Sequence, residues 1–325
     1  DKNWRQSALR LLVNMGPEAR SALPILRQAL KDQDNLVRLY AVRTLNNINL
    51  TPAEVCSTLL EVVQDRDVEV RYTAISALGR KKVFSQQVIY ALTQALNDPE
   101  DLIRTAAAYV LGIIDPPPQE ALPDLRDALN DPHYQVRHAA ALSLFKIASD
   151  ADTRQEALAL LIDALNHQDE EVSRSACFRL MQIGPDARQA VPALKKKLKA
   201  KGIVLRINAA WALAKIDPDR QGRPALKIIT KALNSKYFGV RLEAVFALSQ
   251  IGPVSEEVVP SLVGVLKDRD NDVRRYAIEG LGEIGPAAQP ALGALKEALH
   301  DRDEKVRRAA AEALKKIEGG NKDGL

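Results

Sequence analysis

An all-α superhelix of stacked helical hairpins, an α-solenoid, is the fold class that three features of the sequence predict. A short motif recurs ten times along the 325 residues. The apolar positions of this motif have helical spacing, and a second amphipathic segment precedes the copies. Aromatic residues make up only 4% of the chain, so we expect a core of Leu, Ala, Ile and Val.

The recurring motif is an aliphatic residue, Arg, two variable residues and Ala, followed by Leu four residues later. Successive copies are 33 to 36 residues apart, and Ser replaces the Arg in one copy. The Arg position is occupied by Arg5, Arg38, Arg71, Arg104, Arg137, Ser173, Arg206, Arg241, Arg274 and Arg307. Offsets of −1, +3, +7 and +10 from the Arg fall on one side of a helix, so each copy predicts an amphipathic helix, here named a B helix.

The amphipathic segments between the copies predict the first helix of each hairpin, here named an A helix. Examples are residues 23–30, 122–129, 259–266 and 290–299. Pro near the start suits a first helical turn. A short acidic turn follows, such as Asp65-Arg66-Asp67, and its Asp can cap the next B helix. Gly-Pro pairs such as Gly184-Pro185 are typical stops for B helices.

One hairpin is too thin to bury its own apolar face, so stacking must supply the core. We therefore expect a single array of about ten hairpins over residues 1–318, with the first hairpin incomplete, and a flexible tail over residues 319–325. The longer spacings before Ser173 and Arg241 predict loop insertions at residues 149–153 and 219–223. Residue 1 falls in the middle of a repeat, which indicates a piece of a longer protein.

The stretches 273–286 (VRRYAIEGLGEIGP) and 306–317 (VRRAAAEALKKI) resemble the HEAT superfamily, specifically the short bacterial type called phycobilisome-lyase-like HEAT repeats. The resemblance covers nearly the whole chain. It implies that the B helices line a concave side and that the repeated Arg pairs with the acidic turn in a ladder between neighbours. It also implies a scaffold or protein-binding surface. Some bacterial relatives attach bilin pigments to antenna proteins, and a few others are enzymes.

Charge, cysteine usage and hydropathy narrow the class of partner. The net charge of +4 is small and both signs are interleaved, which argues against nucleic acid as a partner. The two distant cysteines fit a reducing cytosol. No apolar run approaches the roughly 20 residues of a membrane span. We expect a cytoplasmic protein without a membrane partner, and we expect the basic run Lys195–Lys201 to be a solvated face.

Residues that could support catalysis are not arranged for it. The four histidines lack metal-ligand spacing on one helix face. The sequence has no His-Glu dipeptide, the pair by which HEAT-like deoxyhypusine hydroxylases hold iron. No Gly-rich phosphate loop or nucleophile elbow is present. Cys177 lies at a near-core offset and predicts a packed thiol. We therefore expect no enzyme activity, no metal and no cofactor.

The candidate binding residues lie at offset +5 of the B helices, opposite the Ala/Leu face. Polar residues at both ends of this column flank five large apolar ones: Tyr109, Leu142, Phe178, Trp211 and Phe246. Neighbouring offsets add Tyr72, Ile207 and Leu242, while Arg43 and Glu279 give the column a basic and an acidic end. An exposed apolar stripe on a protein surface usually marks an interface.

These observations predict a non-enzymatic scaffold or sensor that binds a protein or peptide segment in its concave groove. The segment belongs either to another protein or to another part of a longer chain. Ordinary packing between B helices is the competing structural explanation of the column. The alternative function is a bilin-lyase-like subunit, in which the flat pigment stacks on the column and Arg71, Arg80 or Lys146 meets its carboxylates. A nucleic-acid-binding HEAT protein is a minor alternative.

Overall fold

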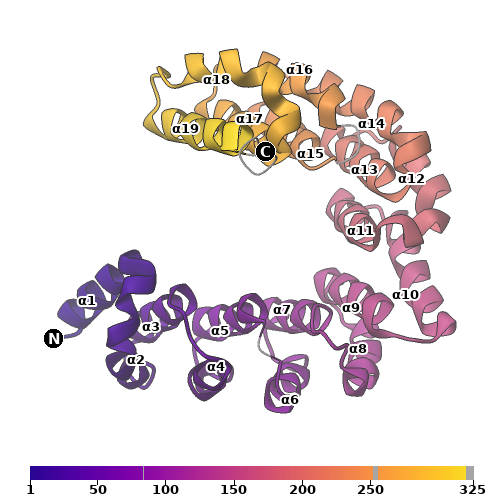
Figure 1. Ribbon diagram of the computed structural model, residues 1–325. Coiled ribbons are helices and arrows are strands. Elements are labelled where there is room, and N and C mark those ends of the chain that lie inside the picture. The colour runs from indigo at the N-terminus through magenta and orange to yellow at the C-terminus, as the bar shows by residue number, and fades with distance from the viewer. Residues whose placement is uncertain (83, 252–254, 320–325) are drawn as a thin grey trace. The chain divides into compact units, whose positions relative to one another are not determined.

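A computed structural model of the protein describes residues 1–82, 84–251 and 255–319. These residues form α-helices and short 3-10 helices without a strand, which confirms the all-α solenoid class (Figure 1). The chain divides into two compact units, residues 1–160 (unit 1) and residues 161–325 (unit 2). The single array over residues 1–318 stays a prediction. Of the predicted tail, residue 319 ends the last helix, and residues 320–325 lie outside the described residues.

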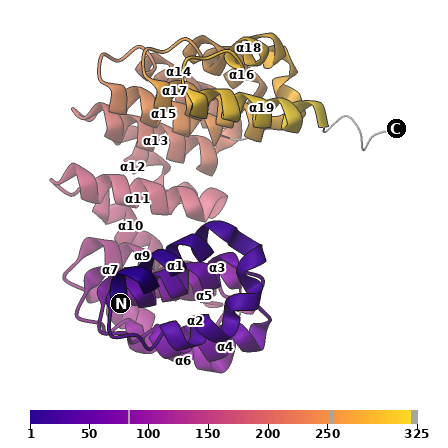
Figure 2. The same ribbon diagram turned by 90° about the vertical axis from the view of Figure 1, so that its left-hand side faces the viewer.

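Unit 1 consists of two layers of helices (Figures 1 and 2). Each B helix packs against the next, and each A helix packs against the B helix that follows it. The B helices are α1 (Lys2–Met15), α3 (Asn35–Asn47), α5 (Val68–Lys81), α7 (Asp101–Leu111) and α9 (Tyr134–Ile147). The A helices are α2 (Leu23–Ala29), α4 (Pro52–Leu59), α6 (Gln86–Ala95) and α8 (Leu122–Asp127).

Unit 2 repeats this two-layer arrangement, and α10 (Ala151–Ala164) contains the boundary between the units. The B helices are α11 (Glu170–Ile183), α13 (Ile203–Ile216), α15 (Phe238–Ser249), α17 (Asn271–Ile284) and α19 (Glu304–Gly319). The A helices are α12 (Val191–Lys197), α14 (Pro218–Ala232), α16 (Ser255–Val265) and α18 (Leu292–Ala298). Consecutive B helices again contact one another from α11 to α19.

The predicted aspartate caps are present at some of the turns between A and B helices, whereas α7, α9, α13 and α15 begin without a side-chain cap. The Asp67 carboxylate accepts hydrogen bonds from the backbone N–H groups of Glu69 and Val70 at 3.0 and 3.2 Å, and so satisfies two donors at the start of α5. Asp34, Asp270 and Asp303 cap α3, α17 and α19 in the same way. The spacing of acidic residues in the sequence therefore fixes where these B helices begin.

The Gly-Pro stops are also confirmed where they are described. Gly16, Gly184 and Gly285 have φ values of +59°, +74° and +68°, which residues with a Cβ rarely adopt. Each starts a seven-residue 3-10 helix that leads into the next A helix: η1 (Gly16–Ala22), η5 (Gly184–Ala190) and η6 (Gly285–Ala291). The fourth pair, Gly252-Pro253, lies outside the described residues.

The longer repeats are accommodated by longer A helices, and the predicted loop insertions are wrong on this point. α14 has 15 residues and contains all of residues 219–223, whereas α12 and α18 have 7 residues each. Likewise α10 has 14 residues and includes residues 151–153, so of the loop predicted at residues 149–153 only residues 149 and 150 lie outside a helix. Pro218 occupies the first turn of α14, where its missing N–H costs no helical hydrogen bond, so the extra residues extend the helix.

The core lies between the two helix layers and between successive B helices. The Ala at offset +3 is buried in every described B helix except α1, which lets the neighbouring helix approach closely. Glycines permit still closer contact: a Cβ on Gly280 would lie 2.5 Å from the Cβ of Ser249 on α15. None of the helices in the described part of the chain is long and apolar enough to cross a membrane.

Candidate functional site

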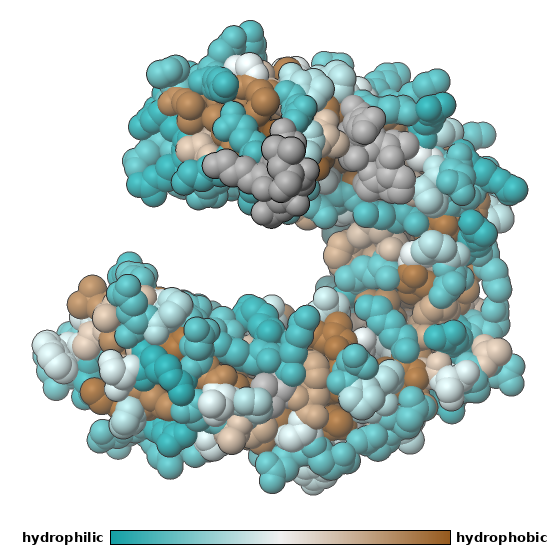
Figure 3. Space-filling model, in the orientation of Figure 1, coloured by the Kyte–Doolittle hydropathy of each residue, from teal (hydrophilic) through white to brown (hydrophobic). Residues whose placement is uncertain are grey.

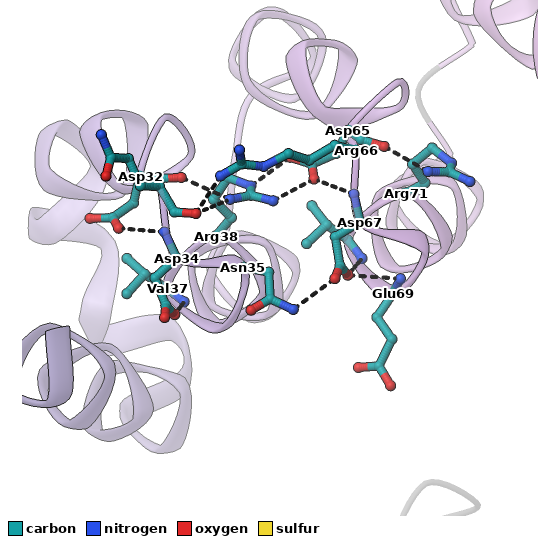
Figure 4. A network of polar contacts seen from close by, with 12 residues as sticks. Asp32, Asp34, Asn35, Val37, Arg38, Asp65, Arg66, Asp67, Glu69 and Arg71 are labelled. Atoms are coloured by element: carbon teal, nitrogen blue, oxygen red, sulfur yellow. Dashed lines mark hydrogen bonds and ion pairs between the residues drawn. The ribbon is translucent and has the colours of Figure 1, made fainter.

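The repeated Arg forms a ladder with the acidic turns, as the family resemblance implied. Arg38 Nε and Nη2 donate to the two carboxylate oxygens of Asp65 at 2.7 and 2.8 Å (Figure 4). Its Nη1 donates to backbone carbonyls of its own turn, at Asp32 and Gln33. Further rungs are Arg5–Asp32, Arg71–Asp98, Arg104–Asp131, Arg241–Asp268 and Arg274–Asp301. This ladder links neighbouring turns, so the guanidiniums of its arginines are engaged in these ion pairs and do not form a binding stripe.

The charge state of the rungs follows from their surroundings. Burial has the largest single effect on the pKa of Asp268 and raises it, but the hydrogen bonds from Arg241 and from the Asp270 N–H, together with the charges of Arg241 and Arg269, hold the pKa below its ordinary value. The same balance lowers the pKa of Asp131 beside Arg104. Hydrogen bonding to Asp268 in turn raises the pKa of Arg241. Arg241 and Asp268 are therefore both ionised at neutral pH.

The ladder is interrupted at three consecutive turns, where His167, Ala200 and Ser235 replace the carboxylate. His167 Nδ1 accepts from the Asp169 N–H at 3.0 Å, and Ser235 Oγ accepts from the Tyr237 N–H at 3.2 Å. Asp268 does the same for Asp270 at 2.9 Å, so His and Ser preserve the turn without supplying a negative charge.

The predicted binding column is only partly exposed. Tyr109, Phe178 and Phe246 have exposed fractions of 37%, 42% and 44%. Tyr72 and Arg43 are exposed as well, and Leu242 and Glu279 are half-buried. Leu142, Ile207 and Trp211 have exposed fractions of 1%, 1% and 6%, so the prediction that these three lie on the surface is wrong. Tyr72, Tyr109 and Leu142 belong to unit 1, and Ile207, Leu242 and the other three aromatics belong to unit 2.

Neighbouring helices explain this burial. The prediction of exposure used the rotation of 100° per residue within one helix. B helices pack side by side, however, and cover part of one another's surface. The Trp211 ring meets the Phe246 ring edge-on, with centroids 5.5 Å apart and an interplanar angle of 90°, so α15 covers α13 at this point. Ile207 joins the core of unit 2, and α9 is buried on nearly every side, which encloses Leu142.

A pocket of ≈ 320 Å³ opens on the B helices at the C-terminal end of unit 2, and we name it the B-face pocket. Its lining residues come from α15, α17, α19 and the residue after α15: Phe246, Ser249, Gln250, Tyr276, Glu279, Gly280, Gly282, Glu283, Ala309, Glu312, Ala313 and Lys316. Phe246 and Glu279 were predicted to bind a partner. Sequence reasoning missed Glu283 and Lys316 because they lie at offset +9, outside the offsets that defined the column. The missed signal is the pair of small residues Gly280 and Gly282, which let α17 lie close to α15 and α19.

The B-face pocket is acidic and partly aromatic. Glu283 pairs with Lys316, and Glu279 accepts from Arg275 at 2.8 Å. Glu312 makes no hydrogen bond or ion pair among the described residues. The hydrogen bond to Glu283 raises the pKa of Lys316, and the charges of Glu312 and Glu279 add to this effect. The Arg275 guanidinium lies 4.1 Å from the Tyr276 ring centroid and fixes that ring in place.

The remaining candidate features are structural. Burial raises the pKa of the Cys177 thiol to about 12, so the thiolate required for reactivity does not form near neutral pH. Lys195, Lys196 and Lys197 occupy the last turn of α12, where cations complement the helix dipole. Within residues 1–82, 84–251 and 255–319, no three His, Cys, Asp or Glu side chains are grouped to hold a metal ion. The visible face of each unit carries apolar patches interrupted by polar side chains (Figure 3).

Comparison with known proteins identifies the family. In the comparison with solved structures, a chain of the complex of CpcE and CpcF of phycocyanin lyase from Nostoc sp. PCC7120 is 21% identical, with a TM-score of 0.51 over 83% of this chain and 95% of that one. A chain in a homology model of the full-length AP-3 complex is 14% identical, with a TM-score of 0.55 over 95% of this chain and 59% of that one. Both likenesses concern the fold alone. No curated protein matches the sequence. The family model described as HEAT repeats matches residues 1–68, 56–145, 122–214, 158–237, 191–276 and 259–324. The chain therefore belongs to the HEAT-repeat family.

Proposed function

We propose that this HEAT-repeat chain is a non-enzymatic interaction scaffold that binds a peptide segment of another protein on its B helices. The observation that carries the proposal is the B-face pocket, where Phe246, Tyr276 and three glutamates converge. Such a pocket suits a segment that places an apolar side chain next to Lys or Arg. The apolar side chain would pack on the two rings, and the basic one would meet the carboxylates.

The contacts that each pocket side chain already makes indicate whether it would supply affinity or orientation for the bound segment. Aromatic anchors in a partly enclosed pocket supply most of the affinity of an interface, and rim charges set orientation and association rate. Phe246 has an exposed fraction of 44% and is therefore available for contact. Glu312 has no hydrogen-bonded partner in the described chain, so a cation of the partner would not have to displace an existing ion pair.

The other exposed members of the predicted column extend this surface within each unit. Phe178 lies on α11 in unit 2, and Tyr72 and Tyr109 lie on α5 and α7 in unit 1. Leu242 and Arg43 stay as predicted contacts. Leu142, Ile207 and Trp211 support the face from beneath, and we no longer propose that they touch a partner.

The proposal is tested by selecting random peptides on phage against the intact chain. We expect enriched peptides to combine an apolar residue with an adjacent Lys or Arg, and to bind more weakly at high salt. Phe246→Ser combined with Glu312→Gln should weaken binding at least about ten-fold, the loss expected for one anchor and one charge. Tyr237→Ser is the matched control, because Tyr237 has an exposed fraction of 58% but lies outside the pocket.

Equal binding by the double variant and the unmodified chain would move the partner site away from the B-face pocket. A bilin supplied in the same assay tests the pigment-handling alternative, since a bound bilin is coloured and a peptide is not. If the peptide instead comes from elsewhere in a longer version of this chain, that segment should compete with the selected peptides when it is added separately.

A further inference from the structure

A second pocket, of ≈ 640 Å³, lies in unit 2 beside the turn that joins α14 to α15, and we name it the turn pocket. Its lining residues are Leu198, Ile203, Arg206, Ile207, Ile228, Lys231, Ala232, Asn234 and Ser235. Four are large and aliphatic, two are cationic, and none is acidic. The turn pocket shares no residue with the B-face pocket, so what it binds is independent of the proposed function.

Arg206 occupies the repeat position of a ladder arginine. Its Nη1 donates to the carbonyls of Ala200 and Lys201 at 2.7 and 3.2 Å, as the Nη1 of Arg241 donates to Ser235 and Lys236 at 3.0 and 3.4 Å. The two guanidiniums are therefore held in the same way by the turns beneath them.

The two guanidiniums differ in the hydrogen bonds made by their Nε and Nη2 atoms. Arg241 Nε and Nη2 donate to the two carboxylate oxygens of Asp268 at 2.7 and 2.9 Å. Ser235 stands where Arg206 would require such an Asp, and its Oγ accepts from the Tyr237 N–H. Arg206 Nε and Nη2 consequently make no hydrogen bond within the described residues. Arg206 and Ser235 both line the turn pocket, so the guanidinium that carries this unused pair of donors borders an open space.

We infer that the turn pocket binds a carboxylate carried on an aliphatic body. The unused edge of Arg206 is the edge that takes a carboxylate at each filled rung, and a planar guanidinium binds a carboxylate through two parallel hydrogen bonds. Lys231 supplies a second positive charge at the pocket. Leu198, Ile203 and Ile228 form the wall for the hydrocarbon, and the lining is mostly apolar, as in ordinary small-molecule sites.

The test titrates the intact chain with sodium octanoate and follows the Arg206 Nε–H signal by NMR, assigned from its loss in Arg206→Lys. We expect a saturable shift. Octanamide, which has nearly the same shape without the charge, should bind at least about ten-fold more weakly, the effect of losing a charge-assisted pair. Ser235→Asp should abolish octanoate binding and raise the melting temperature, because the new carboxylate would complete the missing rung. Ser235→Asn is the uncharged control and should still bind octanoate.

Equal binding of octanoate and octanamide, or unchanged octanoate binding by a folded Ser235→Asp variant, would overturn the inference. If Ser235→Asp does not fold, Arg206→Met replaces it and must lose octanoate binding. A second arm compares a short peptide ending in Leu with its C-terminal amide. Tighter binding of the free-acid peptide than of octanoate would identify a protein C-terminus as the source of the carboxylate, and the reverse order would identify a small molecule. Binding of neither acid would refute the site.

Discussion

Except at Arg5–Asp32, each filled rung of the ladder places a largely buried guanidinium against a carboxylate with little exposure. The Arg38 and Asp65 side chains, for example, have exposed fractions of 4% and 8%. Such a pair need not add much stability relative to an apolar pair of the same size, because both ions lose water. Removing one partner is costly, however, because it leaves a buried charge without compensation. The rungs therefore specify which turn faces which, and the sequence keeps both members together.

Acid should destabilise the protein through the rung aspartates. Hydrogen bonds from Arg274 hold the pKa of Asp301 below its ordinary value of about 3.9, although burial opposes this shift. The pKa of Asp268 is also lowered: burial is the largest single effect there and raises it, but the hydrogen bonds and charges of Arg241 and its neighbours together outweigh burial. Because the unfolded chain binds protons at these groups at higher pH than the folded chain does, their contribution is complete above about pH 4 and is lost as pH falls through the lowered folded pKa.

This prediction is checked by urea unfolding between pH 7 and pH 2.5, followed by circular dichroism. The unmodified chain should lose stability steeply below pH 4. Asp301→Asn should be less stable near neutral pH but lose less on acidification, since position 301 no longer titrates. Parallel pH profiles for the two chains would contradict the assignment.

From the sequence of this chain, the pairing of charged residues was predicted more successfully than the exposure of apolar residues. The family resemblance implied the ladder, and the acidic turns predicted the aspartate caps; both were found where the sequence has the Asp, because the partners then sit at fixed offsets. The surface of Tyr109, Phe178 and Phe246 was also predicted from helical periodicity. The burial of Leu142 and Trp211 was not, because it depends on how closely the next helix lies, and one offset along one helix carries no information on that distance.

At the scale of the helices, the repeated Ala, Leu and Gly positions set the approach of neighbouring B helices. The type and order of the helices were predictable from the residues at their ends: Pro near the start of A helices, Asp before B helices and Gly-Pro after B helices. The extra residues before α15 were predicted as a loop but extend α14, which begins at Pro218 and continues through Gly222 and Pro224 although both residue types disfavour a helix interior. The B-face pocket was missed because it forms between α15, α17 and α19, and the sequence of one helix does not specify how its neighbours are placed.

Gly280→Ala should destabilise the protein even though Ala favours helices. The gain in helix propensity is roughly 0.5–1 kcal/mol, whereas the new Cβ would lie 2.5 Å from Ser249 Cβ and force the two B helices apart at about 1–3 kcal/mol. Gly264→Ala in α16 is the matched control, because its Cβ would meet nothing within 4 Å and it should stabilise. Urea midpoints of the two variants should move in opposite directions, and a rise for Gly280→Ala would refute the close approach.

At the scale of the whole molecule, stability is a sum over hairpins and over the contacts between neighbours, so the protein need not open all at once. Helices that bury few side chains should open first. Among the B helices, α1 buries only Leu9, and Trp4, Leu11 and Met15 have exposed fractions of 73%, 66% and 47%. By contrast, α3 buries seven side chains between its neighbours.

Amide hydrogen exchange measured by mass spectrometry should show this difference. We expect the amides of α1 to exchange at least about ten-fold faster than those of α3, which corresponds to about 1.4 kcal/mol in local opening. Peptides from α5 and α7 provide internal controls and should be protected like α3. Equal protection of α1 and α3 would mean that α1 is held by contacts as extensive as those of an internal repeat.

Because the ladder is interrupted, the resistance of unit 2 to stretching should differ along its length. The rungs at Arg241 and Arg274 act as cross-braces between successive turns, each spanning 27 residues of chain. Ser173 and Arg206 bond only to carbonyls of their own turns, so the coils formed by α11, α13 and α15 lack these braces. If unit 2 is pulled along the row of turns, we expect the hairpins without an Arg–Asp rung to separate first. The braced coils, which carry the B-face pocket, would then keep their shape while the rest of unit 2 absorbs the strain.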